Sequence, residues 1–94
     1  MSLDVLLRDS VFADLEGISA WIAKDNPRAA QDVLSRILDA IERLGTFPGL
    51  GHTRKVPGTR EWVVRGLPYI IVYEVNLDLQ ELTVLAVFHG ARDR

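Results

Sequence analysis

The sequence predicts an α+β fold in which two helices pack on one face of a mostly antiparallel, four-stranded sheet. Three observations lead to this prediction: a short strand-like segment at the N-terminus, two adjoining segments with helical periodicity, and three strand-like segments that form a meander in the second half of the chain. With 94 residues the chain has the length of one domain, residues 1–94, built around one hydrophobic core.

The first strand and the first helix occupy the N-terminal quarter. Apolar side chains at every second position of residues 3–7 are typical of a short strand. A helix is expected over residues 10–24, capped by residue 9 or 10, because apolar residues recur mostly three or four positions apart. Phe12 and Trp21 belong to this apolar set, and Trp21 is expected in the core. The helix must end before Pro27, because a residue that precedes proline avoids the helical conformation.

The second helix begins at Pro27, where the missing N–H costs nothing, and Asn26 is its expected N-cap. An unbroken apolar stripe predicts an amphipathic helix of about 20 residues that ends at Gly45. The stripe consists of Ala29, Ala30, Val33, Leu34, Ile37, Leu38, Ile41 and Leu44. Because the link between the two helices is short, they are expected to form an antiparallel hairpin.

Three strand-like runs follow, at residues 60–65, 69–75 and 82–88. The segment between the last two, residues 76–80, is rich in the residue types of hairpin turns. The middle run is apolar at nearly every position. We therefore expect it at the centre of the sheet, with helices covering at least one side.

Composition excludes several classes of function. No segment approaches the ~20 apolar residues of a membrane span, and the N-terminus lacks the pattern of a secretory signal, so a cytoplasmic location is expected. The chain has no cysteine, and His52 and His89 are far apart in the sequence, so neither a metal nor another cofactor is expected. The net charge is −2, and basic residues gather only in residues 52–66. Direct, sequence-specific binding to nucleic acid is therefore not expected.

Five segments, in this order, resemble the RelE/ParE superfamily of bacterial toxins from type II toxin–antitoxin modules, specifically its ParE branch. They are ADLEGISAWIAKDNPRAA (residues 13–30), FPGLG (47–51), GTREWVV (58–64), PYIIVYEV (68–75) and VFHGARDR (87–94). The resemblance implies the fold predicted above and a toxin held inactive by a ParD-like antitoxin. It also implies one of two activities: ParE-like members inhibit DNA gyrase, and RelE-like members are ribosome-dependent messenger ribonucleases.

The run from Tyr69 to Tyr73 favours the gyrase inhibitor. Metal-free RNA cleavage needs a base, an acid and cations that stabilise the charge on the phosphate. RelE-like enzymes place such basic groups on strands that include this one, whereas this chain has Ile70, Ile71 and Val72 there. We therefore expect a protein that acts by binding and is not an enzyme. A ribonuclease and a non-toxic, antitoxin-binding scaffold are the alternatives.

The candidate functional residues form three overlapping sets. A ribonuclease would use an acid–base set of Arg60, Glu61, Arg65, His89 and Arg92. Contacts with the target are expected from Arg54, Lys55, Arg60, His89, Arg92 and Arg94. Contacts with the antitoxin are expected from Trp62, Arg65 and Tyr73, in a groove beside the helical hairpin or at a sheet edge. A simpler interpretation of Glu61 is an ion pair with a neighbouring arginine.

Overall fold

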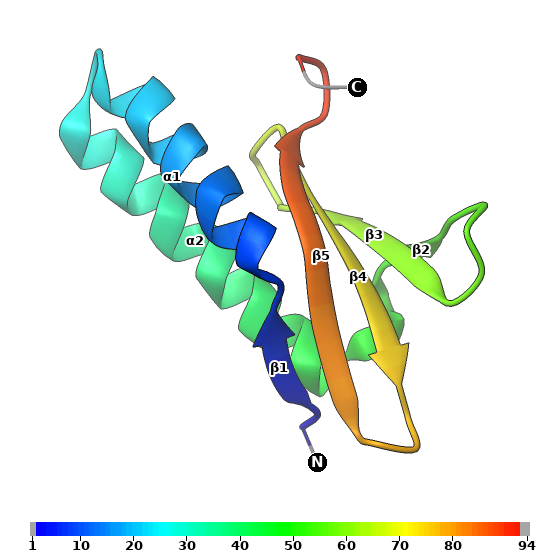
Figure 1. The fold of residues 1–94 in the computed structure, drawn as a ribbon. Helices are drawn as coiled ribbons and strands as arrows, with labels where there is room; N and C mark the ends of the chain where they lie inside the picture. The colour runs from blue at the N-terminus through cyan, green and yellow to red at the C-terminus, as the bar shows by residue number, and fades with distance from the viewer. Residues whose placement is uncertain (1, 93–94) are drawn as a thin grey trace.

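The computed structural model describes residues 2–92, which form a helical hairpin and one sheet (Figure 1). The helices are α1 (Asp9–Ala23) and α2 (Pro27–Thr46), and a 3₁₀ turn, η1 (Pro48–Leu50), follows α2. The strands are β1 (Asp4–Leu7), β2 (His52–Thr53), β3 (Thr59–Val63), β4 (Tyr69–Asn76) and β5 (Glu81–His89). The predicted α+β class, with its helical hairpin and C-terminal meander, is confirmed.

The sheet of the described residues has five strands in the order β1-β5-β4-β3-β2. β1 runs parallel to β5, and the other neighbours are antiparallel. The prediction of four strands was wrong by one, because β2 has only two residues and no alternating pattern that would mark it. β4 is the central strand, as predicted, and residues 69–73 are all buried.

The core lies between the hairpin and one face of the sheet (Figure 1). α1 contributes Val11, Leu15 and Ile18 to it, and α2 contributes Ile37, Ile41 and Leu44. The sheet contributes alternate residues of β4, Tyr69, Ile71 and Tyr73, together with residues of β5. These spacings of three and four residues in the helices and two in the strand place each set on one face of its element.

Trp21 is not a core residue, contrary to the prediction: its exposed fraction is 53%, and that of Phe12, from the same apolar set, is 54%. α1 buries a narrow stripe through Val11, Leu15 and Ile18, and the two aromatic residues lie on its opposite shoulders, each about a quarter of a turn away. The set of apolar residues at helical spacing is therefore wider than the face of α1 that the sheet covers.

The helix ends differ slightly from the predictions. Arg8 is the N-cap residue of α1 and makes no side-chain capping bond, so neither residue 9 nor residue 10 has this role. Asn26 caps α2 as predicted, because its Oδ1 accepts a hydrogen bond from the Ala29 N–H at 3.0 Å. α2 continues one residue past Gly45, whose carbonyl accepts a hydrogen bond from the Leu3 N–H and so joins the helix end to the chain before β1. Within residues 2–92, neither helix has the length and apolar character needed to cross a membrane.

Candidate functional site

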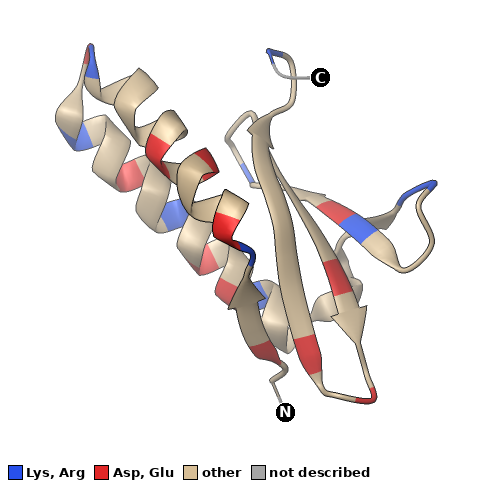
Figure 2. Cartoon of the chain, in the orientation of Figure 1, with Lys and Arg blue, Asp and Glu red and all other residues tan. Residues whose placement is uncertain are grey.

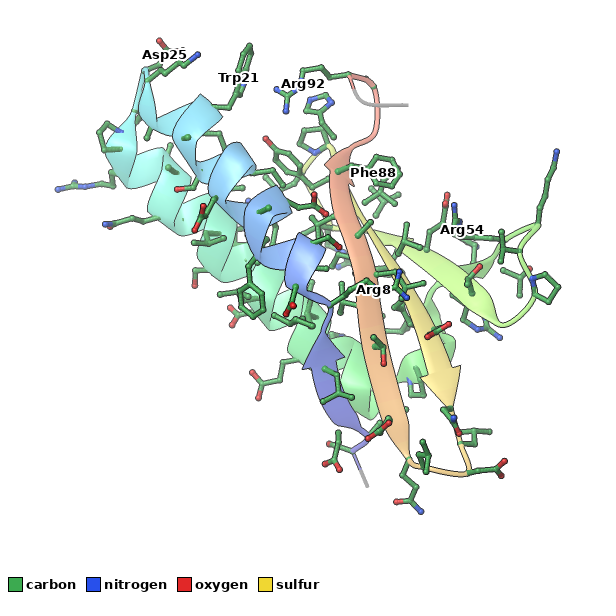
Figure 3. The ribbon with its side chains drawn as sticks, in the orientation of Figure 1. Arg8, Trp21, Asp25, Arg54, Phe88 and Arg92 are labelled. Atoms are coloured by element: carbon green, nitrogen blue, oxygen red, sulfur yellow. The ribbon has the colours of Figure 1, made fainter. Side chains whose placement is uncertain are left out.

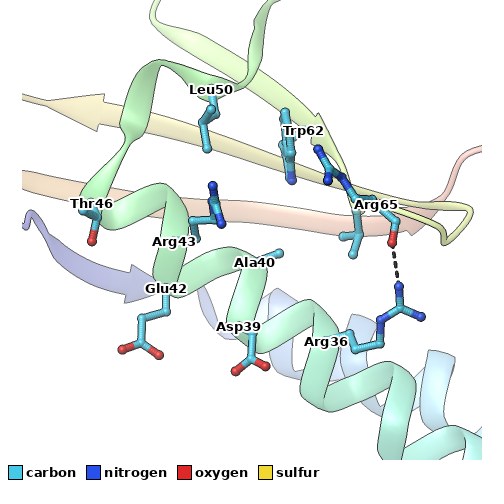
Figure 4. Close-up of a pocket in the computed structure, with 10 residues that line it drawn as sticks. Arg36, Asp39, Ala40, Glu42, Arg43, Thr46, Leu50, Trp62 and Arg65 are labelled. Carbon is cyan, nitrogen blue, oxygen red and sulfur yellow. Dashed lines mark hydrogen bonds between the residues drawn. The ribbon is translucent and has the colours of Figure 1, made fainter.

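A groove of about 630 Å³ runs between α2 and β3 (Figure 4). We call it the α2–β3 groove. Its lining includes Arg36, Ala40 and Arg43 from α2, Leu50 from η1, Trp62 from β3, and Val64 and Arg65 directly after β3. In this groove, apolar and basic side chains of three separate segments meet around one hollow.

Local geometry explains how these residues come together. Arg36, Ala40 and Arg43 are spaced by four and three positions, so they lie on one face of α2. Trp62 is paired with the core residue Ile71 of β4, so it points to the face of the sheet that the helices cover. The chain turns sharply after Arg65 at Gly66, whose φ of 76° is in the left-handed region that favours glycine. This turn brings the Arg65 carbonyl to α2, where it accepts a hydrogen bond from Arg36 Nη2 at 2.7 Å.

The floor of the groove is apolar and anchored. Val64 belongs to the core cluster, and Trp62, Ala40 and Leu50 pack against that cluster while keeping part of their surface accessible. A half-buried indole that is held in place loses little conformational freedom when a partner covers it. Aromatic residues in such positions often dominate the free energy of binding at protein interfaces.

The rim of the groove carries positive charge. None of the guanidinium groups of Arg36, Arg43 and Arg65 forms an ion pair with a carboxylate of residues 2–92. Arg43 lies 5.8 Å from the ring centroid of Phe47, a cation–π contact that leaves its donors available. Figure 4 shows Arg43 pointing toward Leu50 and Trp62, whereas the carboxylates of Asp39 and Glu42 point away from β3. The groove thus combines an apolar floor with three available guanidinium groups.

Of the residues predicted to bind an antitoxin, Trp62 and Arg65 both line this groove, but Tyr73 does not. The Tyr73 side chain is completely buried. Its hydroxyl donates to the Pro48 carbonyl at 2.6 Å and accepts from the Gly51 N–H at 2.9 Å. Burial raises its pKa above the usual 10.0, although the Gly51 N–H and the nearby Arg60 act in the opposite direction. The prediction for Tyr73 was wrong, because a partner cannot reach a side chain enclosed in the core.

Two residues proposed for an acid–base set, Arg60 and Glu61, lie on opposite faces of β3. Arg60 lies on the face of β3 that carries Trp62, and its Nη1 donates to the Gly51 carbonyl at 2.8 Å. Glu61 occupies the next position, on the opposite face, where its Oε2 lies 3.3 Å from Nε of Arg54. The ion pair expected for Glu61 is therefore present. Two neighbours in the sequence are thus directed to opposite sides of the sheet.

His89 and Arg92 lie at a third place: His89 is the last residue of β5, and Arg92 lies beyond that end of the strand (Figure 3). The His89 ring packs edge-on against Tyr69, 5.5 Å between centroids, and its Nδ1 accepts from the N–H groups of Ala91 and Arg92. The Arg92 guanidinium lies over the Trp21 ring of α1 at 4.6 Å. The five candidate catalytic residues therefore do not converge on one reacting centre.

The remaining predicted target contacts are dispersed. Arg54 is tied to β3 by its ion pair with Glu61, while Lys55 is exposed in the loop between β2 and β3. Arg94 lies outside the described residues. Figure 2 shows that basic residues do not gather over one face of the fold. Among residues 2–92 there is also no group of three His, Asp or Glu side chains placed to hold a metal ion.

Sequence reasoning missed Arg36 and Arg43, which do not belong to the apolar stripe of α2. A signal was present, because the two arginines are seven residues apart and each directly precedes a core residue, Ile37 and Leu44. Such positions border the buried face of an amphipathic helix. The segment that lies opposite them across the groove, however, depends on the tertiary fold.

Comparison with known proteins identifies the family. The family described as "ParE toxin of type II toxin-antitoxin system, parDE" matches residues 5–94. The chain belongs to the ParE toxin family. It is also 41% identical over 71 residues to "Putative toxin Y4kP" of Sinorhizobium fredii, covering 76% of this chain and 74% of that protein. This ParE-family chain is therefore a toxin of a type II toxin–antitoxin system.

Solved structures share its fold. The "Chromosomal ParDE TA system from P. aeruginosa" contains a chain that matches with a TM-score of 0.80 at 20% identity, covering 94% of this chain and 96% of that one. A mutant of the E. coli toxin RelE in the free state matches with a TM-score of 0.73 at 13% identity, covering 99% of this chain and 88% of that one. At such low identity these likenesses establish the fold of the RelE/ParE superfamily for this ParE-family toxin, and not the activity of either relative.

Proposed function

We propose that this toxin inhibits DNA gyrase by binding to it, and that a ParD-like antitoxin neutralises the toxin by occupying the α2–β3 groove. The observation that carries the proposal is a contrast between two arrangements. The residues that an acid–base mechanism would use lie at separate places, whereas the groove gathers an indole and three arginines around one hollow.

The face of the sheet opposite the helices also argues for binding without catalysis. Ile70 is paired with Val63 on one side and Phe88 on the other, and Val72 is paired with Ala86 on one side and with Glu61 on the other. Apart from Glu61, which is ion-paired with Arg54, these side chains make the centre of that face apolar. A pentacovalent phosphate intermediate needs donors aimed at its oxygens, and losing one such donor typically costs 10²- to 10³-fold in rate.

The gyrase proposal is tested with purified toxin and purified gyrase. We expect the toxin to inhibit supercoiling and to increase the amount of cleaved DNA trapped by gyrase, and we expect induced expression in cells to trigger the DNA-damage response. Arrest of translation with cleaved messenger RNA, and no effect on gyrase, would contradict the proposal and favour a ribonuclease. Normal growth on induction would favour a non-toxic scaffold.

The antitoxin proposal is tested by co-expressing the toxin with the protein encoded by the adjoining reading frame. We expect the two proteins to co-purify and the antitoxin to abolish the growth defect. If the adjoining protein neither binds the toxin nor restores growth, this half of the proposal is wrong, whatever the outcome of the gyrase assay.

A further inference from the structure

We infer that the segment seated in the α2–β3 groove is an acidic, amphipathic peptide that places one apolar side chain on Trp62 and carboxylates against Arg36, Arg43 and Arg65. This inference rests on the proposed function and adds the chemistry of the partner. It follows from the groove's floor, its charge and its length.

The floor selects an apolar anchor. Trp62 and Leu50 are half-buried, and Ala40 on the facing helix has a small side chain that leaves space above it. An apolar side chain that entered there would cover an indole already held against the core. Removing apolar surface from water is favourable in proportion to the area covered, so one well-seated aliphatic or aromatic side chain strengthens binding.

The rim selects carboxylates. A guanidinium group binds a carboxylate through two parallel hydrogen bonds, and these are stronger than bonds between neutral groups. Arg43 and Arg65 make no hydrogen bond through their guanidinium groups within residues 2–92, and Arg36 uses one donor on the Arg65 carbonyl. All three therefore have donors left for a bound partner, without any internal ion pair to break.

The spacing of the arginines predicts the spacing of the partner's acidic residues. Arg36 and Arg43 are seven residues apart on α2, which is about 10 Å along the helix axis. A helical partner of about two turns spans the same length, with its apolar anchor near the middle and carboxylates three or four positions to either side. The occupant is therefore expected to follow the pattern acidic, apolar, acidic at helical spacing.

A peptide fits this surface better than a nucleic acid does. Asp39 and Glu42 also line the α2–β3 groove, and both helices carry acidic residues along their length (Figure 2). A uniformly negative phosphate backbone would be repelled by these carboxylates, whereas a peptide can place neutral or basic side chains beside them. The net charge of −2 likewise works against a polyanion, whose affinity grows with the number of phosphates neutralised.

The test uses full-length toxin and the full-length protein encoded by the adjoining reading frame, with their affinity measured by calorimetry at two salt concentrations. We expect the toxin variant with both Arg43→Glu and Arg65→Glu to bind about 100-fold more weakly, because each carboxylate of the partner would face a like charge. The matched control is Arg28→Glu, an exposed α2 arginine outside the groove, with an expected change below about threefold. Circular dichroism melting curves must show that both variants stay folded.

A charge exchange gives a second, independent readout. Replacing the acidic residues of the antitoxin segment by lysine should restore at least part of the affinity for the Arg43→Glu and Arg65→Glu toxin. If the toxin with both charge reversals bound the antitoxin with the same affinity as the wild type, this inference would be wrong and the proposed function would stand. Absence of any wild-type complex would overturn the proposed neutralisation itself, and the inference with it.

Nucleic acid binding is measured in parallel, with fluorescently labelled single-stranded RNA and duplex DNA of random sequence. We expect no binding at moderate salt. Binding that is abolished by Arg43→Glu together with Arg65→Glu would overturn the inference, because the groove would then recognise phosphates.

Discussion

At the scale of single residues, Tyr73 explains why two of the sequence motifs occur together. Its hydroxyl accepts from the Gly51 N–H and donates to the Pro48 carbonyl, so β4 holds the turn that leads from α2 into β2. Arg60 adds a second bond, to the Gly51 carbonyl. A Cβ at Gly51 would collide with the Tyr73 hydroxyl, so this close approach requires glycine. The FPGLG segment and the Tyr73 ring are therefore one structural unit.

We predict that Tyr73→Phe lowers the free energy of unfolding by about 1 to 3 kcal/mol, because it leaves the buried Gly51 N–H and the Pro48 carbonyl without this partner. Urea denaturation followed by circular dichroism measures the change. The matched control is Tyr69→Phe, since the Tyr69 hydroxyl makes no hydrogen bond within residues 2–92. Equal losses in the two variants would show that the hydroxyl of Tyr73 contributes nothing specific.

The raised pKa of Tyr73 predicts a pH dependence of stability. In the unfolded chain this phenol loses its proton near pH 10.0, whereas burial keeps it protonated in the native state to higher pH. Above pH 10 the unfolded state therefore binds fewer protons than the native state, and the stability contributed by Tyr73 falls as the pH rises. We expect the stability difference between wild type and Tyr73→Phe to shrink over the pH range above 10. A constant difference across this range would contradict the assignment.

At the scale of elements, the two helices are started by different means. α1 begins after Arg8 without a side-chain cap, and the acidic Asp9 in its first turn interacts favourably with the helix dipole. α2, which supplies one wall of the groove, has both a proline in its first turn and the Asn26 cap. The helix that carries Arg36 and Arg43 therefore has the more firmly defined start.

We predict that Asn26→Ala destabilises the fold by about 1 kcal/mol, because the Ala29 N–H loses its only capping acceptor. Asn26→Asp keeps an acceptor oxygen at the same place and is the matched control, with little expected loss. Thermal denaturation of the three proteins measures both effects. The cap would have no role in stability if Asn26→Ala melted with the wild type.

At the scale of the whole molecule, strong periodic signals made the fold predictable. The stripe of α2 and the apolar run of β4 each specify one element and its buried faces, and a short link forces the helices into a hairpin. The errors occurred where the pattern was ambiguous. Trp21 recurs at roughly helical spacing, but it lies about a quarter of a turn away from the stripe of α1 that is buried, and it is exposed. β2 exists because the Tyr73 bonds place its two residues beside β3, which no local pattern reveals.

The candidate site was less predictable than the fold. Residue type alone singled out Trp62 and Arg65, since exposed aromatic residues and arginines are common at interfaces. Arg36 and Arg43 join them only because η1 and the Gly66 turn bring β3 alongside α2. Tyr73 was misjudged because a tyrosine in an apolar strand can present its ring to a partner or bury it, and the choice depends on a turn distant in the sequence.

The α2–β3 groove and the Trp21–Arg92 contact are separate surfaces, and this separation leads to a prediction. Arg92 is held over Trp21 at the end of α1, and neither residue lines the α2–β3 groove. If the basic C-terminal segment contacts the target, the combined change of Arg92→Ala and Arg94→Ala should weaken toxicity about tenfold or more, because each lost charged contact typically costs 1.5 to 3 kcal/mol. Its affinity for the antitoxin should stay within about threefold of wild type.

The charge-reversed groove should behave in the opposite way. Toxin with Arg43→Glu and Arg65→Glu should remain toxic and should also escape neutralisation by co-expressed antitoxin, because only the partner's carboxylates meet the reversed charges. Colony counts after induction, with and without antitoxin, measure both variants in one experiment. Full toxicity of the Arg92 and Arg94 variant would remove the C-terminal arginines from the target surface. If both variants lost toxicity and antitoxin binding together, one shared surface would serve both partners, contrary to the separation seen between the groove and the Trp21–Arg92 contact.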